Sequence, residues 1–272
     1  MSIFKKIILI LCVISILNFG CVVAYSAEEI DDFMGMGDAK VVKVVFIGDS
    51  NSGRTACLNR LVNLPFDFYN KFPTVHSSCV TKQIVCKDPK TNAPIRLDID
   101  YWDTSGNKAL RAQVLDLRAR DADFVIITIN LEDVCKEGDL WRLRLHINNW
   151  INAIKEINPR SNIILLGTYL DIVKQMIEYG EITQEHFKKV QDLFCDMAQG
   201  ISKYTEMRAK ALFVSAMSGE NFDQIEKLIY QTIVENNLLD SLKTRNKSIV
   251  SYASEHDDES YTPPKKSSCY IL

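Results

Sequence analysis

Apolar runs and amphipathic stretches alternate along the middle of the chain. Residues 41–47 form a near-continuous apolar run, which is typical of a strand buried on both faces of a sheet. Further apolar or alternating runs predict strands at 81–87, 95–102, 124–130, 162–167 and 211–214. Helical patterns lie at 53–61, 108–119, 140–157, 183–210 and 221–238. The alternation predicts an α/β domain with a mostly parallel six-stranded sheet and helices on both faces.

The N-terminal part of the chain, residues 1–27, is expected to be a signal peptide. A lysine pair precedes an apolar run at 7–17, and small residues suited to cleavage follow at 22–27. Two alternatives stay open. Cys21 is the acylation site if the segment is that of a lipoprotein, and residues 7–24 are just long enough to be an uncleaved membrane anchor.

Polar segments flank the predicted domain. Residues 28–39 are polar and contain glycine, so they are expected to be a linker. The strand and helix pattern then sets the domain at 40–238. Residues 239–272 are polar and are expected to form a disordered tail.

Composition excludes several classes of function. The formal net charge is -3, so the chain is not expected to bind nucleic acid. None of the eight cysteines forms a CxxC pair, and no spacing resembles that of a zinc site.

A glycine-containing turn follows the first predicted strand. Its sequence from Gly48 to Thr55 is GDSNSGRT, and a helix is expected directly after it. Such a turn lets backbone N–H groups approach phosphate, and the helix N-terminus favours the anion. Thr55 is then a ligand for Mg²⁺. Arg54 stands where this motif usually has lysine; arginine keeps the charge but is longer, planar and forked.

Three more short motifs follow predicted strands. They are DTSG at 103–106, TYLD at 168–171 and SAM at 215–217. A further segment, FPTV at 72–75, contains Thr74, which lies 20 positions after Arg54.

In this order the motifs resemble those of a Ras-superfamily small GTPase of the Rab or Rho type. The resemblance implies a P-loop NTPase fold that binds GTP or GDP with Mg²⁺. It implies Thr55, Thr74 and Asp103 as metal ligands, and Arg54 and Asn107 as catalytic residues. The implied nucleotide-binding residues are Asp49, Ser50, Asn51, Ser52, Gly53, Arg54, Thr55, Ala56, Thr74, Gly106, Thr168, Tyr169, Asp171, Ser215, Ala216 and Met217.

Several positions depart from the family pattern. Asn107 replaces the glutamine that orients the attacking water and is one methylene shorter, so hydrolysis is expected to be slow. Thr168 and Tyr169 replace the first two residues of NKxD, while Asp171 keeps the acceptor for guanine; the Tyr169 ring is expected to stack on the base. Asn51 brings bulk where the family often has glycine. The stretch from Asp171 to the SAM motif is long, which predicts an enlarged helical segment.

The C-terminus resembles a prenylation box. Cys269 is fourth from the end and leucine is last, which fits C-a-a-X with a geranylgeranyl preference. Lys265 and Lys266 add a small basic signal. One lipid and two lysines predict modest, reversible membrane binding at the cytosolic face of an endomembrane.

The two ends imply different compartments, because a signal peptide exports the chain whereas prenylation is cytosolic. One history is a secreted bacterial effector that a host cell prenylates. The other is a eukaryotic protein whose apolar N-terminus is not a signal.

The motifs and their departures from the family pattern are compatible with two functions. The first is a membrane-anchored guanine-nucleotide switch in vesicle trafficking, with effectors and regulators of Rab type as partners and a long-lived on state. The alternative is a pseudo-GTPase that captures Rab regulators or effectors without nucleotide turnover. A P-loop ATPase or nucleoside kinase fits poorly, because no lid arginines stand out and Asp171 favours guanine.

Overall fold

The computed structural model describes residues 38–63, 78–106, 113 and 115–245. Its strands are β1 (Ala39–Gly48), β2 (Ser78–Lys87), β3 (Pro94–Asp103), β4 (Phe124–Asn130), β5 (Asn162–Thr168), β6 (Arg208–Phe213) and β7 (Lys243–Arg245). Its helices are α3 (Arg54–Leu61), α5 (Leu131–Glu137), α6 (Leu140–Ile157), α7 (Leu170–Glu178), α8 (Gln184–Tyr204) and α9 (Phe222–Glu235). Two short turns add a π-helix, η2 (Leu115–Ala119), and a 3₁₀ helix, η3 (Leu238–Asp240).

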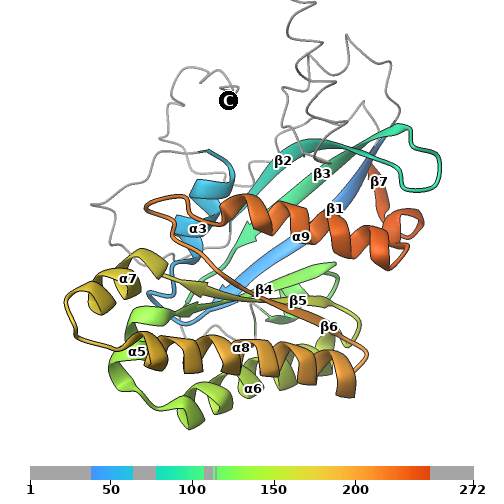
Figure 1. Ribbon diagram of the computed structural model, residues 1–272. Helices are drawn as coiled ribbons and strands as arrows, with labels where there is room; N and C mark the ends of the chain where they lie inside the picture. The colour runs from blue at the N-terminus through green and yellow to red at the C-terminus, as the bar shows by residue number, and fades with distance from the viewer. Residues whose placement is uncertain (1–37, 64–77, 107–112, 114, 246–272) are drawn as a thin grey trace, which may run out of the picture. The chain divides into compact units, whose positions relative to one another are not determined.

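The strands follow the order β2-β3-β1-β4-β5-β6, and β7 pairs with β1 (Figure 1). The pairs β1–β4, β4–β5 and β5–β6 are parallel, whereas β7 runs antiparallel to β1. This confirms the predicted α/β class with a mostly parallel sheet. Among the described residues the sheet has seven strands, whereas six were expected. The additional strand is β7, whose three polar residues give no strand signal in the sequence.

Contacts divide the chain into two compact units. Among the described residues, the first comprises 38–41, Gln83–Ile99 and 237–245, and the second comprises 42–63, 78–82, 100–106, 113 and 115–236. The four short motifs all lie in the second unit.

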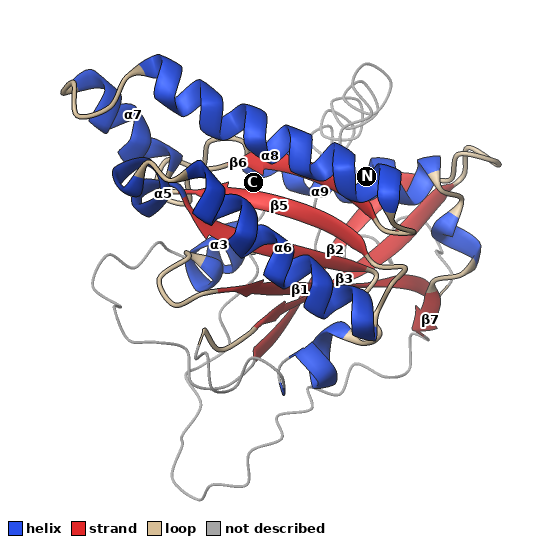
Figure 2. Ribbon diagram, turned by 90° about the horizontal axis from the view of Figure 1, so that it is seen from below, coloured by secondary structure: helices blue, strands red, loops and turns tan. Residues whose placement is uncertain are grey.

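The second unit has helices on both faces of its strands. Figure 2 shows α6 and α8 across the near face, and Figure 1 shows α3 and α9 on the opposite side. Helix α6 illustrates why: its buried residues recur at helical spacing, so one face is apolar. They are Leu143, Ile147, Trp150, Ile151 and Ile154. The helix begins where Asp139 accepts a hydrogen bond from the Arg142 N–H at 3.0 Å, as an N-cap does.

The strand register brings the polar ends of the parallel strands to one edge. Gly48 at the end of β1 pairs with Thr128, and Asn130 at the end of β4 pairs with Thr168 at the end of β5. In open α/β sheets ligands bind outside the carboxyl ends of the strands. The motifs after β1 and β5 therefore lie at the edge where a ligand site is expected.

The segment after α7 differs from the expected helix over 183–210. Helix α8 ends at Tyr204, where Thr205 adopts an extended conformation and its hydroxyl donates to the Ile201 carbonyl at 2.7 Å. Strand β6 then starts at Arg208, earlier than the expected Ala211. The sequence pattern misplaced this boundary because Arg208 and Lys210 resemble the polar face of a helix. The predicted enlargement is present as α7 and α8.

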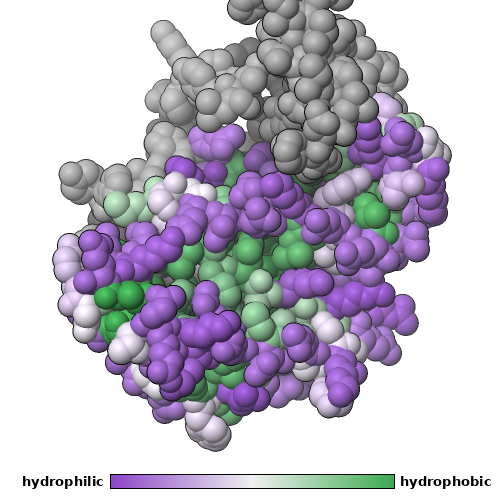
Figure 3. All heavy atoms as spheres, in the orientation of Figure 1, coloured by the Kyte–Doolittle hydropathy of each residue, from purple (hydrophilic) through white to green (hydrophobic). Residues whose placement is uncertain are grey.

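Strand β6 is the last in the strand order. On the face seen in Figure 3, apolar surface forms a band between α9 and α8, where β6 runs. Arg208 and Lys210 are exposed at the start of this strand. Charged side chains on an edge strand oppose pairing with another chain.

In the first unit, β7 holds the end of the described chain against the start of β1. Ala39 pairs with Arg245, whose Nη1 lies 3.2 Å from the buried Asp98 carboxylate. The Arg96 Nε lies 3.4 Å from the same carboxylate. Leu239 and Leu242 are also buried, and the described structure continues past residue 238 to Arg245.

Several expected features fall outside the described residues. They include the signal peptide, most of the linker, residues 108–112 of an expected helix, and residues 246–272 of the expected tail. Within the described ranges, no helix is both long and apolar enough to cross a bilayer.

Replacing Arg245 by methionine tests the role of β7. Arg245→Met removes one cation from a buried carboxylate, so the free energy of unfolding is expected to fall by about 1–3 kcal/mol in urea denaturation. The control is Arg160→Met, because the Arg160 side chain is 87% exposed. An exposed ion pair contributes little, so the control is expected to change stability by less than about 0.5 kcal/mol. Equal effects of the two substitutions would contradict the role of Arg245.

Candidate nucleotide-binding site

The loop between β1 and α3 has the backbone of a phosphate-binding loop. Asn51 has φ 62° and Gly53 has φ 81°, both in the left-handed region. Such turns direct successive N–H groups towards one point and bind anions. Asparagine tolerates this conformation better than most residues, and the Asn51 side chain is exposed. The expected bulk at Asn51 therefore points to solvent and leaves the loop conformation intact.

Gly48 is required at the start of the loop because there is no room for a side chain. A Cβ at this position would lie 2.6 Å from the Ser52 hydroxyl and from the Thr128 carbonyl oxygen. These two residues are themselves joined, since their hydroxyl oxygens lie 2.7 Å apart. The loop is thus packed directly against β4.

Arg54 fills the centre of the loop. Its guanidinium is buried, and Nη1 donates to the backbone carbonyls of Gly48 and, at 2.8 Å, of Asp49. Nε donates to the carbonyl of Thr104 at 3.0 Å. Desolvation lowers the pKa of Arg54, and the carboxylates of Asp103 and Asp49 act in the opposite direction. Since arginine remains protonated in proteins, the loop contains a fixed positive charge.

Thr55 and Asp103 meet beside this charge. The Thr55 hydroxyl donates to Asp103 Oδ2 at 2.6 Å, and Asp103 Oδ1 lies 3.9 Å from the Arg54 Nε. A hydroxyl and a carboxylate are hard oxygen ligands, so this pair fits Mg²⁺. The other expected ligand, Thr74, lies outside the described residues. Among the described residues there is no cluster of three or more His, Cys, Asp or Glu side chains suited to a metal.

The DTSG segment also closes over the loop. The Ser50 hydroxyl donates to the Gly106 carbonyl at 3.0 Å, and the Thr104 hydroxyl donates to the Phe46 carbonyl at 2.6 Å. Asn107, the expected catalytic residue, lies outside the described residues.

Thr168 connects the next strand to the same loop. Its hydroxyl lies 2.9 Å from the Ser52 carbonyl and 3.1 Å from the Ile129 carbonyl, and it is the donor to both. Thr168 is buried, and within the described residues its hydroxyl is hydrogen-bonded to backbone carbonyls only. This residue therefore positions the loop.

Tyr169 lies beside the loop, and Asp171 follows it two residues later in α7. Tyr169 has φ 61°, and a Cβ placed on Gly53 would lie 3.4 Å from its ring. Burial, chiefly, raises the pKa of its hydroxyl. The Asp171 carboxylate is half-buried and accepts no hydrogen bond from the residues that the structure describes. An aromatic ring beside the loop is thus followed, two residues later, by a carboxylate.

The SAM segment forms a tight loop that follows β6. The Ser215 hydroxyl accepts from the Ser218 N–H at 3.0 Å, and its carbonyl accepts from the Gly219 N–H at 2.9 Å. Lys174 of α7 pairs with Glu220 at 2.6 Å, which ties this loop to the helix that contains Asp171. Ala216 is half-buried and Met217 is 50% exposed. Ala56 is half-buried in the first turn of α3.

Sequence reasoning missed several contributors to the loop. Thr104 supplies a carbonyl to Arg54, and Thr128 supplies a hydroxyl to Ser52. On α6, His146 Nδ1 lies 3.9 Å from Asp49 Oδ2. Thr104 could have been found because it lies within the DTSG motif. Thr128 and His146 lie in no motif, and only the fold brings them to the loop.

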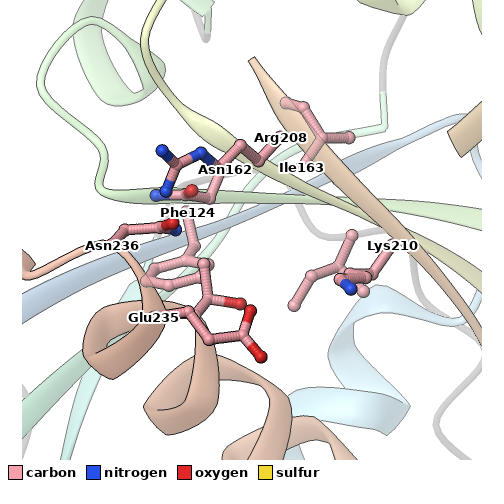
Figure 4. A pocket seen from close by; sticks show the side chains of 9 residues that line it. Phe124, Asn162, Ile163, Arg208, Lys210, Glu235 and Asn236 are labelled. Atoms are coloured by element: carbon pink, nitrogen blue, oxygen red, sulfur yellow. The ribbon is translucent and has the colours of Figure 1, made fainter. Parts of the chain in front are cut away.

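A shallow pocket elsewhere in the second unit has no part in this arrangement. It lies at the first residues of β4, β5 and β6, against the end of α9, and holds about 290 Å³ including open solvent (Figure 4). Phe124, Asn162, Arg208, Lys210 and Glu235 line it with four neighbours. These residues are at the amino ends of the parallel strands, opposite the edge where the motifs lie. Arg208 and Lys210 beside the C-terminus of α9 are explained as cations that complement the helix dipole.

Replacing Gly48 by alanine tests the packing of the loop. Gly48→Ala forces a methyl group against Thr128 and Ser52, so the free energy of unfolding is expected to fall by about 1–3 kcal/mol. The matched control is Gly200→Ala in α8, where a Cβ would meet nothing within 4 Å. That control is expected to gain about 0.5–1 kcal/mol because alanine favours helix. Urea denaturation measures both, and a neutral Gly48→Ala would refute the packing described.

Comparison with known proteins finds Ras-related proteins that are similar to this chain. The family model for the Roc domain, Ras of Complex, of DAPkinase matches residues 43–171. The chain is 24% identical over 206 residues to the Ras-related protein Rab-34 of Homo sapiens, covering 75% of this chain and 68% of Rab-34. It is 24% identical over 196 residues to the Ypt/Rab-type GTPase ypt7 of Schizosaccharomyces pombe, covering 71% of this chain and 84% of ypt7. The fold, the loop and these similarities together support a Ras-superfamily small GTPase domain in this chain.

Proposed function

We propose that this protein is a membrane-anchored guanine-nucleotide switch of Rab type with slow GTP hydrolysis. One observation supports it most directly: a buried Arg54 guanidinium fixed by backbone carbonyls at the centre of a phosphate-binding loop. The carbonyls and Asp103 offset the cost of burying this charge, and a polyanion that contacts the guanidinium adds a charge-assisted interaction. The diphosphate part of a nucleotide is such an anion.

The guanine part of the proposal rests on Asp171 and Tyr169. A carboxylate accepts two hydrogen bonds from N1–H and the 2-amino group of guanine, whereas adenine offers no such pair of donors. The Tyr169 ring beside Gly53 provides an apolar face for the base. The Ser215 loop adds the Ala216 N–H as a donor for the guanine oxygen.

Thr55 and Asp103 would hold Mg²⁺, with Thr74 as a third ligand. Bound there, Mg²⁺ supplies positive charge to phosphate oxygens. The Thr55 hydroxyl that donates to Asp103 retains lone pairs for a second contact. The GTPase activity itself is proposed to be weak, because Asn107 is too short to orient water as glutamine does.

The membrane part rests on the sequence of the tail. Cys269 would carry one prenyl group, and Lys265 and Lys266 would add attraction to anionic lipid. The switch would then act at the cytosolic face of an endomembrane with effectors and regulators of Rab type. If residues 1–27 are a bacterial secretion signal, this membrane belongs to a host cell.

A second candidate is a pseudo-GTPase that binds Rab regulators or effectors without turnover. The ion pair between Arg54 and Asp103, together with the Ser50–Gly106 hydrogen bond, favours it. These contacts hold the loop and the end of β3 together by protein groups alone.

Identification of the co-purifying nucleotide tests the proposal. The full chain is purified in Mg²⁺ and denatured, and the released nucleotide is separated by HPLC. GDP or GTP in near-equimolar amount is expected. Protein that releases none, and does not bind added GDP, would support the pseudo-GTPase instead.

Asp171→Asn tests the guanine contact. The amide loses one acceptor and the charge, so GDP affinity is expected to fall by about 10- to 100-fold. Xanthine has a carbonyl in place of the 2-amino group, so the new amide donor is expected to restore binding of XDP. Titration calorimetry of both nucleotides measures this. Unchanged GDP affinity would show that Asp171 does not face the base.

Asn107→Gln tests the origin of slow hydrolysis. The longer amide is expected to raise the single-turnover rate of GTP hydrolysis by about tenfold or more. Asn63→Gln, in the turn after α3, is the control for an exposed amide and is expected to leave the rate unchanged. If the two variants hydrolyse GTP equally, Asn107 is not the limiting residue.

A further inference from the structure

The Arg54 side chain extends beyond the phosphate loop to the end of β3. Nη1 and Nε are fixed by carbonyls of Gly48, Asp49 and Thr104, which sets the plane of the guanidinium. The remaining nitrogen, Nη2, points to Gly106: a methyl group added there would overlap it. A lysine would end in one ammonium and could not occupy both places.

Ser50 closes the same space from the loop side. Its hydroxyl donates to the Gly106 carbonyl at 3.0 Å. A Cβ on Gly106 would also lie 2.9 Å from the Ser50 nitrogen and Cα. The loop backbone and the end of β3 are therefore in direct contact, with Nη2 beside them.

This contact surrounds the basic side chain of the loop, Arg54. In a loop of this type the backbone N–H groups surround the α- and β-phosphates, and the basic side chain reaches towards the γ-phosphate. The γ-phosphate also orders the segments that surround it in GTPases. Here Ser50, Arg54 and Gly106 already fill the gap between the loop and the end of β3.

We infer that this site selects a nucleoside diphosphate over a triphosphate, because Ser50, Arg54 and Gly106 close the space into which a third phosphate extends. The inference rests on the proposed nucleotide binding and adds its phosphate specificity. To admit a third phosphate, the Ser50–Gly106 hydrogen bond must break and Nη2 must move. The diphosphate requires neither change.

Binding affinities of GDP and of the β,γ-imido analogue of GTP test this, measured by calorimetry in Mg²⁺ with the full chain. The unmodified protein is expected to bind the analogue at least about tenfold more weakly than GDP. Ser50→Ala removes the hydrogen bond and Arg54→Lys removes Nη2, so each is expected to bring the two affinities within about threefold. The Ser50 side chain is exposed, so Ser50→Ala is expected to fold.

Thr81→Ala is the matched control. It also removes an exposed hydroxyl: the Thr81 hydroxyl, on β2, donates to Asp100 of β3 at 2.6 Å. Thr81→Ala is expected to keep the preference for GDP. Equal affinities in the unmodified protein would overturn the inference and leave the proposed function standing. A GDP preference that survives both Ser50→Ala and Arg54→Lys would overturn the role of these residues. Binding of neither nucleotide would refute the proposed function and the inference with it.

Discussion

The site depends on one buried cation. Desolvating a guanidinium is costly, and the cost is offset only where hydrogen-bond acceptors converge on it. For Arg54 these acceptors are backbone carbonyls at the end of β1, in the loop, and just after β3. A single side chain therefore fixes the distance between two segments of chain that are far apart in sequence. Neither Gly48 nor Gly106 has room for a side chain. A Cβ on Gly106 would overlap the Arg54 guanidinium, and a Cβ on Gly48 would overlap Ser52 and Thr128.

The sheet supplies the rest of the geometry. Parallel register aligns the ends of β1, β4 and β5, so the loop, Thr128 and Thr168 meet at one edge. Thr168 and Thr128 then fasten Ser52 from two strands. Tyr169 follows Thr168 directly, and Asp171 follows two residues later. The two residues proposed to recognise the base are therefore close in sequence to Thr168, which contacts the loop proposed to bind phosphate.

The fold class and most strands could be predicted from the sequence because buried strands and amphipathic helices have strong periodic signals. The phosphate loop could be predicted because its glycines and polar residues have a fixed spacing between a strand and a helix. The acceptors of Arg54 could not, since backbone carbonyls have no sequence signature. Strand β7 was missed because a short polar segment becomes a strand only through its partners, here β1 and the buried Asp98. The start of β6 was misplaced because charges at Arg208 and Lys210 suit either an exposed helix face or a sheet edge.

The central claim is that Arg54 is the cation that holds the diphosphate, and the thermal shift caused by GDP tests it most directly. A ligand that binds only the folded state raises the melting temperature, by an amount that grows with its affinity. The account predicts a rise of about 4 °C or more for the unmodified protein at saturating GDP. Arg54→Met, compared with and without GDP, is predicted to show almost no rise, whatever its own melting temperature. A GDP-induced rise in Arg54→Met equal to that of the unmodified protein would contradict the account.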